Sequence, residues 1–198
     1  MTTWIFARHG QSTANAVPML SGHMDVALTD LGREQAATLG AALRSHRIAR
    51  VVSSDLSRAY DTAVIAMRDR PHAIRTTPRL RERHLGSWTG LHYDDMHRVA
   101  GPNFLSTLDA APPDGESLRD VALRVFDELD AMDDGLPTLV VAHGGVLRAV
   151  LGLFDARPAV QVQRAFVVNA APHVRVVPKG TWGELRDAVR RAPFGGTS

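Results

Sequence analysis

The chain has 198 residues, no cysteine and a formal net charge of +2, with 44% hydrophobic and 22% charged residues. This balance excludes global disorder, and the missing cysteines exclude disulfides, thiolate nucleophiles and zinc–thiolate sites. No apolar run reaches the roughly 18 residues of a membrane span, and no basic run carries the interleaved aromatic residues of a nucleic-acid binder. We therefore expect a single cytoplasmic domain over residues 1–198, with neither a membrane nor a nucleic-acid partner.

Apolar spacing and turn residues predict alternating strands and helices in the first part of the chain. The expected elements are a strand at 4–7, a helix from Thr29, a strand at 50–53, a helix at 57–67 and a strand at 74–77. Thr29 is a typical N-cap residue. The apolar residues that follow it recur at helical spacing, at Leu31, Ala36, Leu39 and Leu43.

Glycine and proline interrupt residues 78–115, which we expect to form a loop-rich insertion with one short helix. Ser117 is the predicted N-cap of an amphipathic helix. Its buried face is expected to hold Leu118, Val121, Val125, Leu129 and Met132. The remaining expected elements are a strand at 138–142, a helix at 144–154, strands at 165–168 and 174–177, and a helix at 184–191.

The order of strand, crossover helix and strand is typical of a mostly parallel sheet covered by helices on both faces. The sequence therefore predicts an α/β fold of three layers, without internal repeats. The insertion at 78–115 is expected to lie over the active site.

Polar clusters directly follow three of the predicted strands. They are Arg8-His9-Gly10, Ser53-Ser54 with Arg58, and His143-Gly144-Gly145. Ligands of parallel sheets bind outside the carboxyl ends of the strands, where helix N-termini also point. Two arginines, two histidines and several backbone N–H groups at one such edge would form a pocket suited to a phosphate dianion.

Known metal and nucleotide motifs are missing from the sequence. It contains no H-E-x-x-H, no G-x-x-x-x-G-K, no G-x-G-x-x-G and no G-x-S-x-G. His84, His92 and His97 are spaced so that they do not share one helical face. We therefore expect no metal site and no cofactor.

Residues 8–15, R-H-G-Q-S-T-A-N, resemble the R-H-G-x-(S/T)-x-x-N signature of the histidine phosphatase superfamily, also called phosphoglycerate mutase-like. Further blocks of this family follow in its order along the chain. They are Gly22 with Leu28-Thr29 and Gly32, Ser53 to Ala59 with Thr62-Ala63, Leu80-Arg81-Glu82 with Gly86, Trp88 and Gly90, Gly115-Glu116-Ser117, and His143-Gly144. The resemblance covers roughly residues 4–145 and implies the α/β fold predicted above.

The resemblance implies that His9 is a nucleophile forming a phosphohistidine and that Glu82 is the general acid and base. Arg8 and Arg58 would disfavour a protonated His9. Together with His143, they would hold the non-bridging oxygens of the phosphoryl group. Further substrate contacts are expected from Asn15, Ser21, Gly22 and Gly144, although Ser21 stands where many phosphatases of the family carry glutamine.

The family contains both phosphatases and 2,3-bisphosphoglycerate-dependent mutases, and the fold does not separate them. Residues 82–86, E-R-H-L-G, are close to the E-R-H-Y-G of the mutases, which keeps the mutase as an alternative. Residues 97–116 lack the lysine and paired arginines that would retain a bisphosphorylated intermediate, so we predict a phosphatase of small phosphate esters. A third hypothesis, from outside the enzymes, is a protein that binds a phosphorylated ligand without catalysing a reaction.

The substrate and several supporting roles stay open at this point. Residues 53–63 and 79–90 are most similar to actinobacterial phosphatases of phosphoglycerate-type sugar acids, but similar blocks occur in broad-specificity acid phosphatases and α-ribazole phosphatases. Asn169 is expected to support the site, while the sequence assigns no role to Arg83 or His84. The resemblance also raises the expectation of a homodimer.

Overall fold

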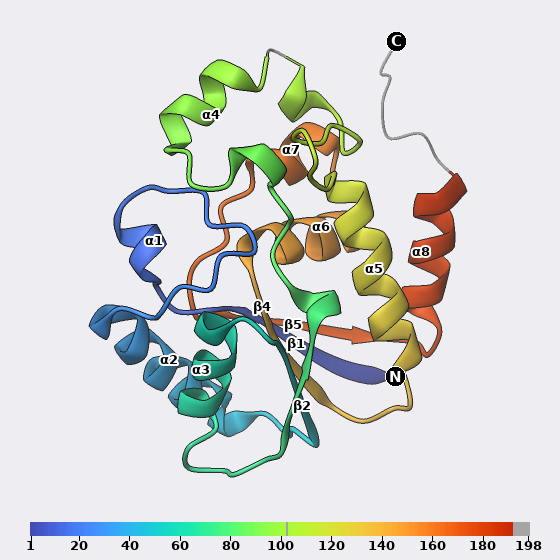
Figure 1. Ribbon diagram of the computed structural model, residues 1–198. Helices are drawn as coiled ribbons and strands as arrows, with labels where there is room; N and C mark the ends of the chain where they lie inside the picture. Colours follow the sequence, from blue (N-terminus) through green and yellow to red (C-terminus); the bar gives the residue numbers. More distant parts are fainter. Residues whose placement is uncertain (102, 192–198) are drawn as a thin grey trace.

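A five-stranded sheet forms the centre of the computed structural model, which describes residues 1–101 and 103–191 without the side chain of His97 (Figure 1). The strand order is β3-β2-β4-β1-β5. The strands are β1 (Thr2–Arg8), β2 (Arg50–Ser54), β3 (Ile74–Thr77), β4 (Thr138–Ala142) and β5 (Pro172–Val177). β5 runs antiparallel to β1 and the other pairs are parallel, so the predicted mostly parallel sheet is confirmed.

Eight α-helices occur in the described residues. They are α1 (Thr13–Ala16), α2 (Asp30–Ala42), α3 (Ser57–Ala66), α4 (Tyr93–Val99), α5 (Leu118–Ala131), α6 (Gly144–Phe154), α7 (Ala159–Arg164) and α8 (Thr181–Arg191). Short 3₁₀ helices cover Leu43–Ser45, Pro78–Leu80, Gly86–Trp88 and Phe104–Ser106. Over the described part of the chain, no helix combines the length and the apolar character needed to cross a membrane.

Helices cover both faces of the sheet, as predicted, because alternate strand residues point to opposite sides. On β1, Ile5 and Ala7 pack in a cluster with residues of α2 and α3. Trp4 and Phe6 point the other way, into the larger cluster that α5, α6 and α8 cover. Figure 1 shows the two helical layers on either side of the sheet. Both faces are therefore shielded from water, which accounts for the continuous apolar runs of the central strands.

The predicted helix starts at Thr29 and Ser117 are confirmed by their capping hydrogen bonds. The Thr29 hydroxyl accepts from the Gly32 N–H, at 3.0 Å. Ser117 forms a capping box in which its hydroxyl and its backbone N–H both bond with Asp120. Each such cap stabilises its helix by about 1 kcal/mol. The two caps therefore fix the residues at which α2 and α5 begin.

Three sequence expectations about the elements are wrong in detail. The strand predicted at 165–168 is absent: Phe166 is 82% exposed, and only Asn169 forms an isolated bridge, to Arg8. Leu31, expected on the buried face of its helix, is 48% exposed because that face begins one residue later at Gly32. The last helix starts at Thr181, three residues before the predicted start. Helices α1 and α7 were not predicted, since four and six residues are too short for a periodic signal.

The insertion at 78–115 has its own small apolar cluster beside the sheet. Trp88 and Phe104 pack with Leu20 from the long loop after α1, and the Trp88 and Phe104 ring centroids lie 4.7 Å apart. The predicted short helix of this segment is α4, at the top of Figure 1. This cluster is separate from the two main ones, while Leu80 and Leu108 tie the insertion to the larger main cluster.

Candidate active site

The register of the sheet brings His9 and His143 together. β1 and β4 are parallel, with Arg8 opposite Ala142, so the residues that follow both strands leave the sheet side by side. The His9 N–H donates to the Ala142 carbonyl at 3.0 Å. The two imidazole rings lie 5.1 Å apart between centroids, and both side chains are buried. The expected meeting of these two polar clusters at the carboxyl edge is therefore present in the structure.

The surroundings of His9 select the neutral imidazole with one defined tautomer. Its Nδ1 lies 2.6 Å from the Gly10 carbonyl, which can only accept, so Nδ1 carries the proton and Nε2 keeps its lone pair. Burial, and then the charges of Arg8 and Arg58, lower the pKa of His9 well below 6.5. Asn169 donates from Nδ2 to the His9 carbonyl at 2.7 Å and so braces this residue from the opposite side.

Arg8 and Arg58 are anchored by backbone carbonyls rather than by carboxylates. Arg58, at the start of α3, donates to the carbonyls of Met24 at 2.7 Å and Gly22 at 2.9 Å. Arg8 donates to the Val167 carbonyl at 2.8 Å. These bonds hold both guanidinium groups beside His9 without neutralising their charge.

Four buried nitrogen atoms around His9 have no hydrogen-bond partner within the described residues. They are Nε of Arg8, Nε of Arg58, and both Nδ1 and Nε2 of His143. Burial, and then the charge of Arg58, lower the pKa of His143 well below 6.5, so this ring is also neutral. Buried N–H groups are normally paired, and the unpaired ones of the two arginines and of the neutral His143 ring, which carries one N–H, suit an anionic ligand.

The Glu82 carboxylate lies at the N-terminus of α6. Both its oxygens are 3.0 Å from the Gly145 N–H, and Oε1 also accepts from the Arg83 N–H at 2.7 Å. It thereby satisfies an N–H group that the helix itself leaves unpaired. A Cβ at position 145 would stand 2.2 Å from Oε1, so only glycine allows this approach.

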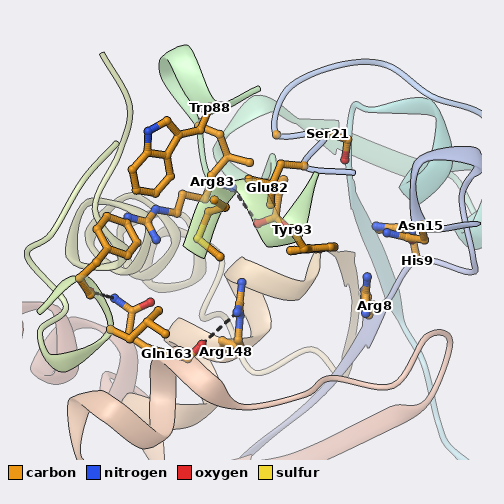
Figure 2. A pocket seen from close by; sticks show the side chains of 16 residues that line it. Arg8, His9, Asn15, Ser21, Glu82, Arg83, Trp88, Tyr93, Arg148 and Gln163 are labelled. Atoms are coloured by element: carbon orange, nitrogen blue, oxygen red, sulfur yellow. Dashed lines mark hydrogen bonds between the residues drawn. The ribbon is translucent and has the colours of Figure 1, made fainter. Parts of the chain in front are cut away.

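Two adjoining cavities open beside His9, with volumes of about 110 and about 680 Å³. Both are lined by Arg8, Asn15, Glu82, Tyr93, Met96, Leu105, Arg148 and Gln163. The smaller one adds His9, Ser21, Gly22, Trp88 and Phe104. Figure 2 shows the side chains of His9, Ser21 and Trp88 around this cavity. The larger one adds Gly144, Phe166 and Asn169. Arg58 and His143 are buried and are not among the residues that line the two cavities, although the His143 ring contacts the His9 ring.

The sequence also matches a known protein family over most of its length. The model of the histidine phosphatase superfamily (branch 1) matches residues 4–186. The chain belongs to this superfamily.

Two curated relatives illustrate the range of the superfamily. A glucosyl-3-phosphoglycerate phosphatase of Mycolicibacterium vanbaalenii is 40% identical over 74% of this chain and 71% of its own length. A 2,3-bisphosphoglycerate-dependent phosphoglycerate mutase of Gloeobacter violaceus is 32% identical over 87% of this chain and 84% of its own length. Among solved structures, a mycobacterial glucosyl-3-phosphoglycerate phosphatase in complex with VO3 has a TM-score of 0.78 at 31% identity, covering 88% of this chain and 92% of that one.

Ser53 and Ser54, which the sequence placed near the superfamily site, bond locally and line neither cavity. The Ser53 hydroxyl donates to the Ser54 carbonyl, and the Ser54 hydroxyl accepts from the Leu56 N–H. They shape the turn that leads into α3. Arg58 is the residue of that block that the structure brings to His9.

Sequence reasoning assigned no role to four polar residues in the wall of the smaller cavity: Arg83, Tyr93, Arg148 and Gln163. The sequence could have placed Arg148 near the site, because Arg148 follows Gly144 by four residues and so lies on the same face of the predicted helix. Tyr93 and Gln163 had no such signal, since their positions depend on how the insertion and α7 pack.

The histidines outside the site form no metal-binding cluster among the residues that the structure describes. His84 contacts the ring of His23 at 4.9 Å between centroids and accepts from the Gly86 N–H. His92 caps α4 by accepting from the Asp94 N–H at 3.3 Å. The side chain of His97 lies outside the described part.

Proposed function

We propose that the protein is a metal-independent phosphomonoesterase that hydrolyses small phosphorylated metabolites through a phosphohistidine on His9. The observation that carries the proposal is the set of unpaired buried nitrogen atoms of Arg8, Arg58 and His143 around a neutral His9 imidazole. This arrangement supplies a nucleophile and a positive, hydrogen-bonding environment for a phosphoryl group at the same place.

In the first step, the His9 Nε2 lone pair forms a bond to phosphorus while the bond between phosphorus and the ester oxygen breaks. Glu82, in its protonated form, gives its proton to the leaving oxygen. Arg8, Arg58 and His143 hold the non-bridging oxygens as charge shifts onto the leaving group. The products of this step are a free alcohol and phosphorylated His9.

In the second step, water replaces His9 on phosphorus. The Glu82 carboxylate, oriented by the Gly145 and Arg83 N–H groups, takes a proton from the attacking water. The bond between phosphorus and nitrogen then breaks, the electron pair returns to Nε2, and inorganic phosphate leaves. Because the carboxyl group is protonated again, the enzyme is ready for the next ester.

The proposal is tested by inorganic phosphate release from a panel of phosphomonoesters in the presence of EDTA. The panel holds p-nitrophenyl phosphate, 3-phosphoglycerate, sugar phosphates and a nucleoside monophosphate. We expect release by the wild type and none above background by His9→Ala. Release by both proteins at equal rates, or loss of release in EDTA, would contradict the mechanism.

The mutase is the second candidate, favoured by the mutase-like residues 82–86 and by the mutase relative. It is tested by exchange between 2- and 3-phosphoglycerate with 2,3-bisphosphoglycerate present. Exchange faster than phosphate release would favour the mutase over the phosphatase.

Turnover of any phosphate ester would contradict the third hypothesis, a protein that binds a phosphorylated ligand without catalysis. The cytoplasmic location and the homodimer stay predictions.

A further inference from the structure

One short segment of the loop after α1 contacts both Arg58 and Glu82, which come from distant parts of the chain. The carbonyls of Gly22 and Met24 hold the Arg58 guanidinium group. The side chain of His23, between these two residues, reaches Glu82: its Nε2 lies 2.7 Å from the backbone carbonyl oxygen of Glu82. The position of this segment therefore affects both groups.

The His23 ring donates this hydrogen bond. A carbonyl oxygen can only accept, so Nε2 carries the proton. Burial lowers the pKa of His23 below 6.5, so at neutral pH the ring is neutral and Nε2 carries its single proton. The ring also packs against that of His84, with 4.9 Å between centroids. Arg124 of α5 donates to the same Glu82 carbonyl at 3.0 Å, so this oxygen is held from two elements.

The carbonyl that His23 holds belongs to the same peptide group as an N–H that holds the Glu82 carboxylate. This N–H is that of Arg83, which donates to Oε1 of Glu82 at 2.7 Å, and Figure 2 marks the bond by a dashed line beside the carboxylate. Because a peptide group is planar, its C=O and N–H turn together. A rotation of the carbonyl away from His23 would also turn the N–H away from the carboxylate and leave the Gly145 N–H as the other donor.

We propose that His23 is a positioning residue for Glu82: by fixing the peptide group between Glu82 and Arg83, it keeps the carboxyl group in place for proton transfer to the leaving oxygen. The inference rests on the proposed phosphatase function and adds a residue to it. His23 is not among the residues that line the two cavities, so it acts through Glu82 and not on the substrate.

His23 is also the residue through which the placement of Glu82 can be tested with little other disturbance. Arg124 donates to the carbonyls of Arg79 and Arg81 as well, and to the Glu116 carboxylate, so its loss would disturb the whole segment. Within the described residues, the hydrogen bond to Glu82 is the only one that the His23 side chain makes.

The test uses two variants of His23 and a matched control. His23→Phe keeps a ring against His84 but removes the donor. His23→Gln supplies an amide N–H at about the same distance along the side chain, so it can restore the bond to the Glu82 carbonyl. His72→Phe is the control, because His72 is also half-buried and bonds to backbone carbonyls, those of Arg70 and Ile48.

The substrates are phenyl phosphate and p-nitrophenyl phosphate, which are similar in shape but differ in how much the leaving oxygen needs a proton. In His23→Phe, kcat/KM for phenyl phosphate should fall by about 3- to 10-fold, the effect of one neutral hydrogen bond. For p-nitrophenyl phosphate, it should change by less than about twofold. His23→Gln should recover most of the loss, and His72→Phe should match the wild type on both esters.

A double variant tests whether His23 acts through Glu82. In the Glu82→Gln protein, the added His23→Phe change should have no further effect on phenyl phosphate, because the group that His23 positions can no longer give a proton. A second loss as large as that in the wild-type background would overturn the proposal.

Equal losses on both esters, or unchanged kcat/KM on both, would also overturn it. Inhibition by inorganic phosphate reports on Arg58, and the inhibition constant of His23→Phe should stay within about twofold of the wild-type value. Weaker inhibition would show that His23 only supports the loop that holds Arg58. Thermal unfolding of each variant separates misfolding from a misplaced carboxylate.

Crystal structures of the two His23 variants keep this inference separate from the phosphatase proposal. If the wild type releases no phosphate from any ester, the phosphatase proposal fails. The placement of Glu82 by His23 then stands if the carboxylate leaves the Gly145 N–H in His23→Phe and keeps it in His23→Gln. A carboxylate at the same place in both variants would overturn it.

Discussion

His9 is buried beside two guanidinium groups, and both features lower its pKa. A protonated imidazole has no lone pair at Nε2, so these surroundings keep the proposed nucleophile reactive at acidic as well as neutral pH. The same residue is fixed in orientation by Gly10 at Nδ1 and by Asn169 at its carbonyl. Position and protonation state are therefore set by different neighbours.

Glu82→Gln should separate the proton-transfer role from binding. Glutamine can accept the same Gly145 hydrogen bond but cannot give a proton to a leaving group. Hydrolysis of alkyl phosphates should fall by about 10²- to 10⁴-fold, the range of general acid catalysis, whereas p-nitrophenyl phosphate, with its good leaving group, should lose far less. Steady-state rates on both substrates measure the difference, with exposed Glu34→Gln as control. Equal losses on both would remove Glu82 as the acid.

At the scale of elements, the first turn of α2 packs directly on the loop that carries His9. A Cβ at Gly32 would stand 2.0 Å from the Gln11 carbonyl oxygen, and a Cβ at Gly10 would stand 2.2 Å from the Gly32 carbonyl oxygen. Both contacts are between backbones, so no side-chain rotation relieves them. The two glycines let α2 support the active-site loop at close range.

Gly32→Ala should therefore destabilise the protein, although alanine is the better helix former by about 1 kcal/mol. Overpacking of this kind costs about 1–3 kcal/mol, and the displaced loop should lower kcat as well. Urea unfolding and phosphatase rates measure the two effects. Gly183→Ala in α8 is the matched control, because its nearest neighbour is the movable Asp130 carboxylate, and it should change little. Higher stability of Gly32→Ala would contradict the close packing.

At the scale of the whole molecule, the buried site makes folding depend on pH. His9 and His143 both have a pKa well below 6.5 in the folded protein, chiefly because they are buried. In the unfolded chain, each takes up a proton as the pH falls through about 6.5. The unfolded state then binds more protons than the folded state, so stability is complete above this pH and is lost below it.

The free energy of unfolding should fall by about 2–3 kcal/mol between pH 7.5 and pH 5.5, the sum for two histidines that remain neutral in the folded protein. Urea unfolding at a series of pH values measures this change. In His143→Gln, the decrease over the same interval should be about half as large, whatever the variant does to stability at pH 7.5. An unchanged free energy across this interval would show that the two rings take up protons in the folded state.

Much of the fold could be predicted from the sequence because its signals are local. Caps at Thr29 and Ser117, and the apolar run at 138–142, mark elements through interactions within a few residues. The predicted cluster of Arg8, His9, Arg58 and His143 also depends on a general rule, since parallel strands end at one edge. The short helices α1 and α7 carry no such local signal.

The layered fold, the polar residues at the strand ends and, through the motifs, the family could all be inferred from the order of the amino acids. The three-dimensional arrangement was needed to show that β5 runs antiparallel, that residues 165–167 line a cavity, and that Arg148 lines the same cavity as Tyr93 from the insertion. These features depend on packing between segments far apart in the chain. Hydrophobic periodicity records which side of an element is buried, but it does not record which distant side chain lies opposite.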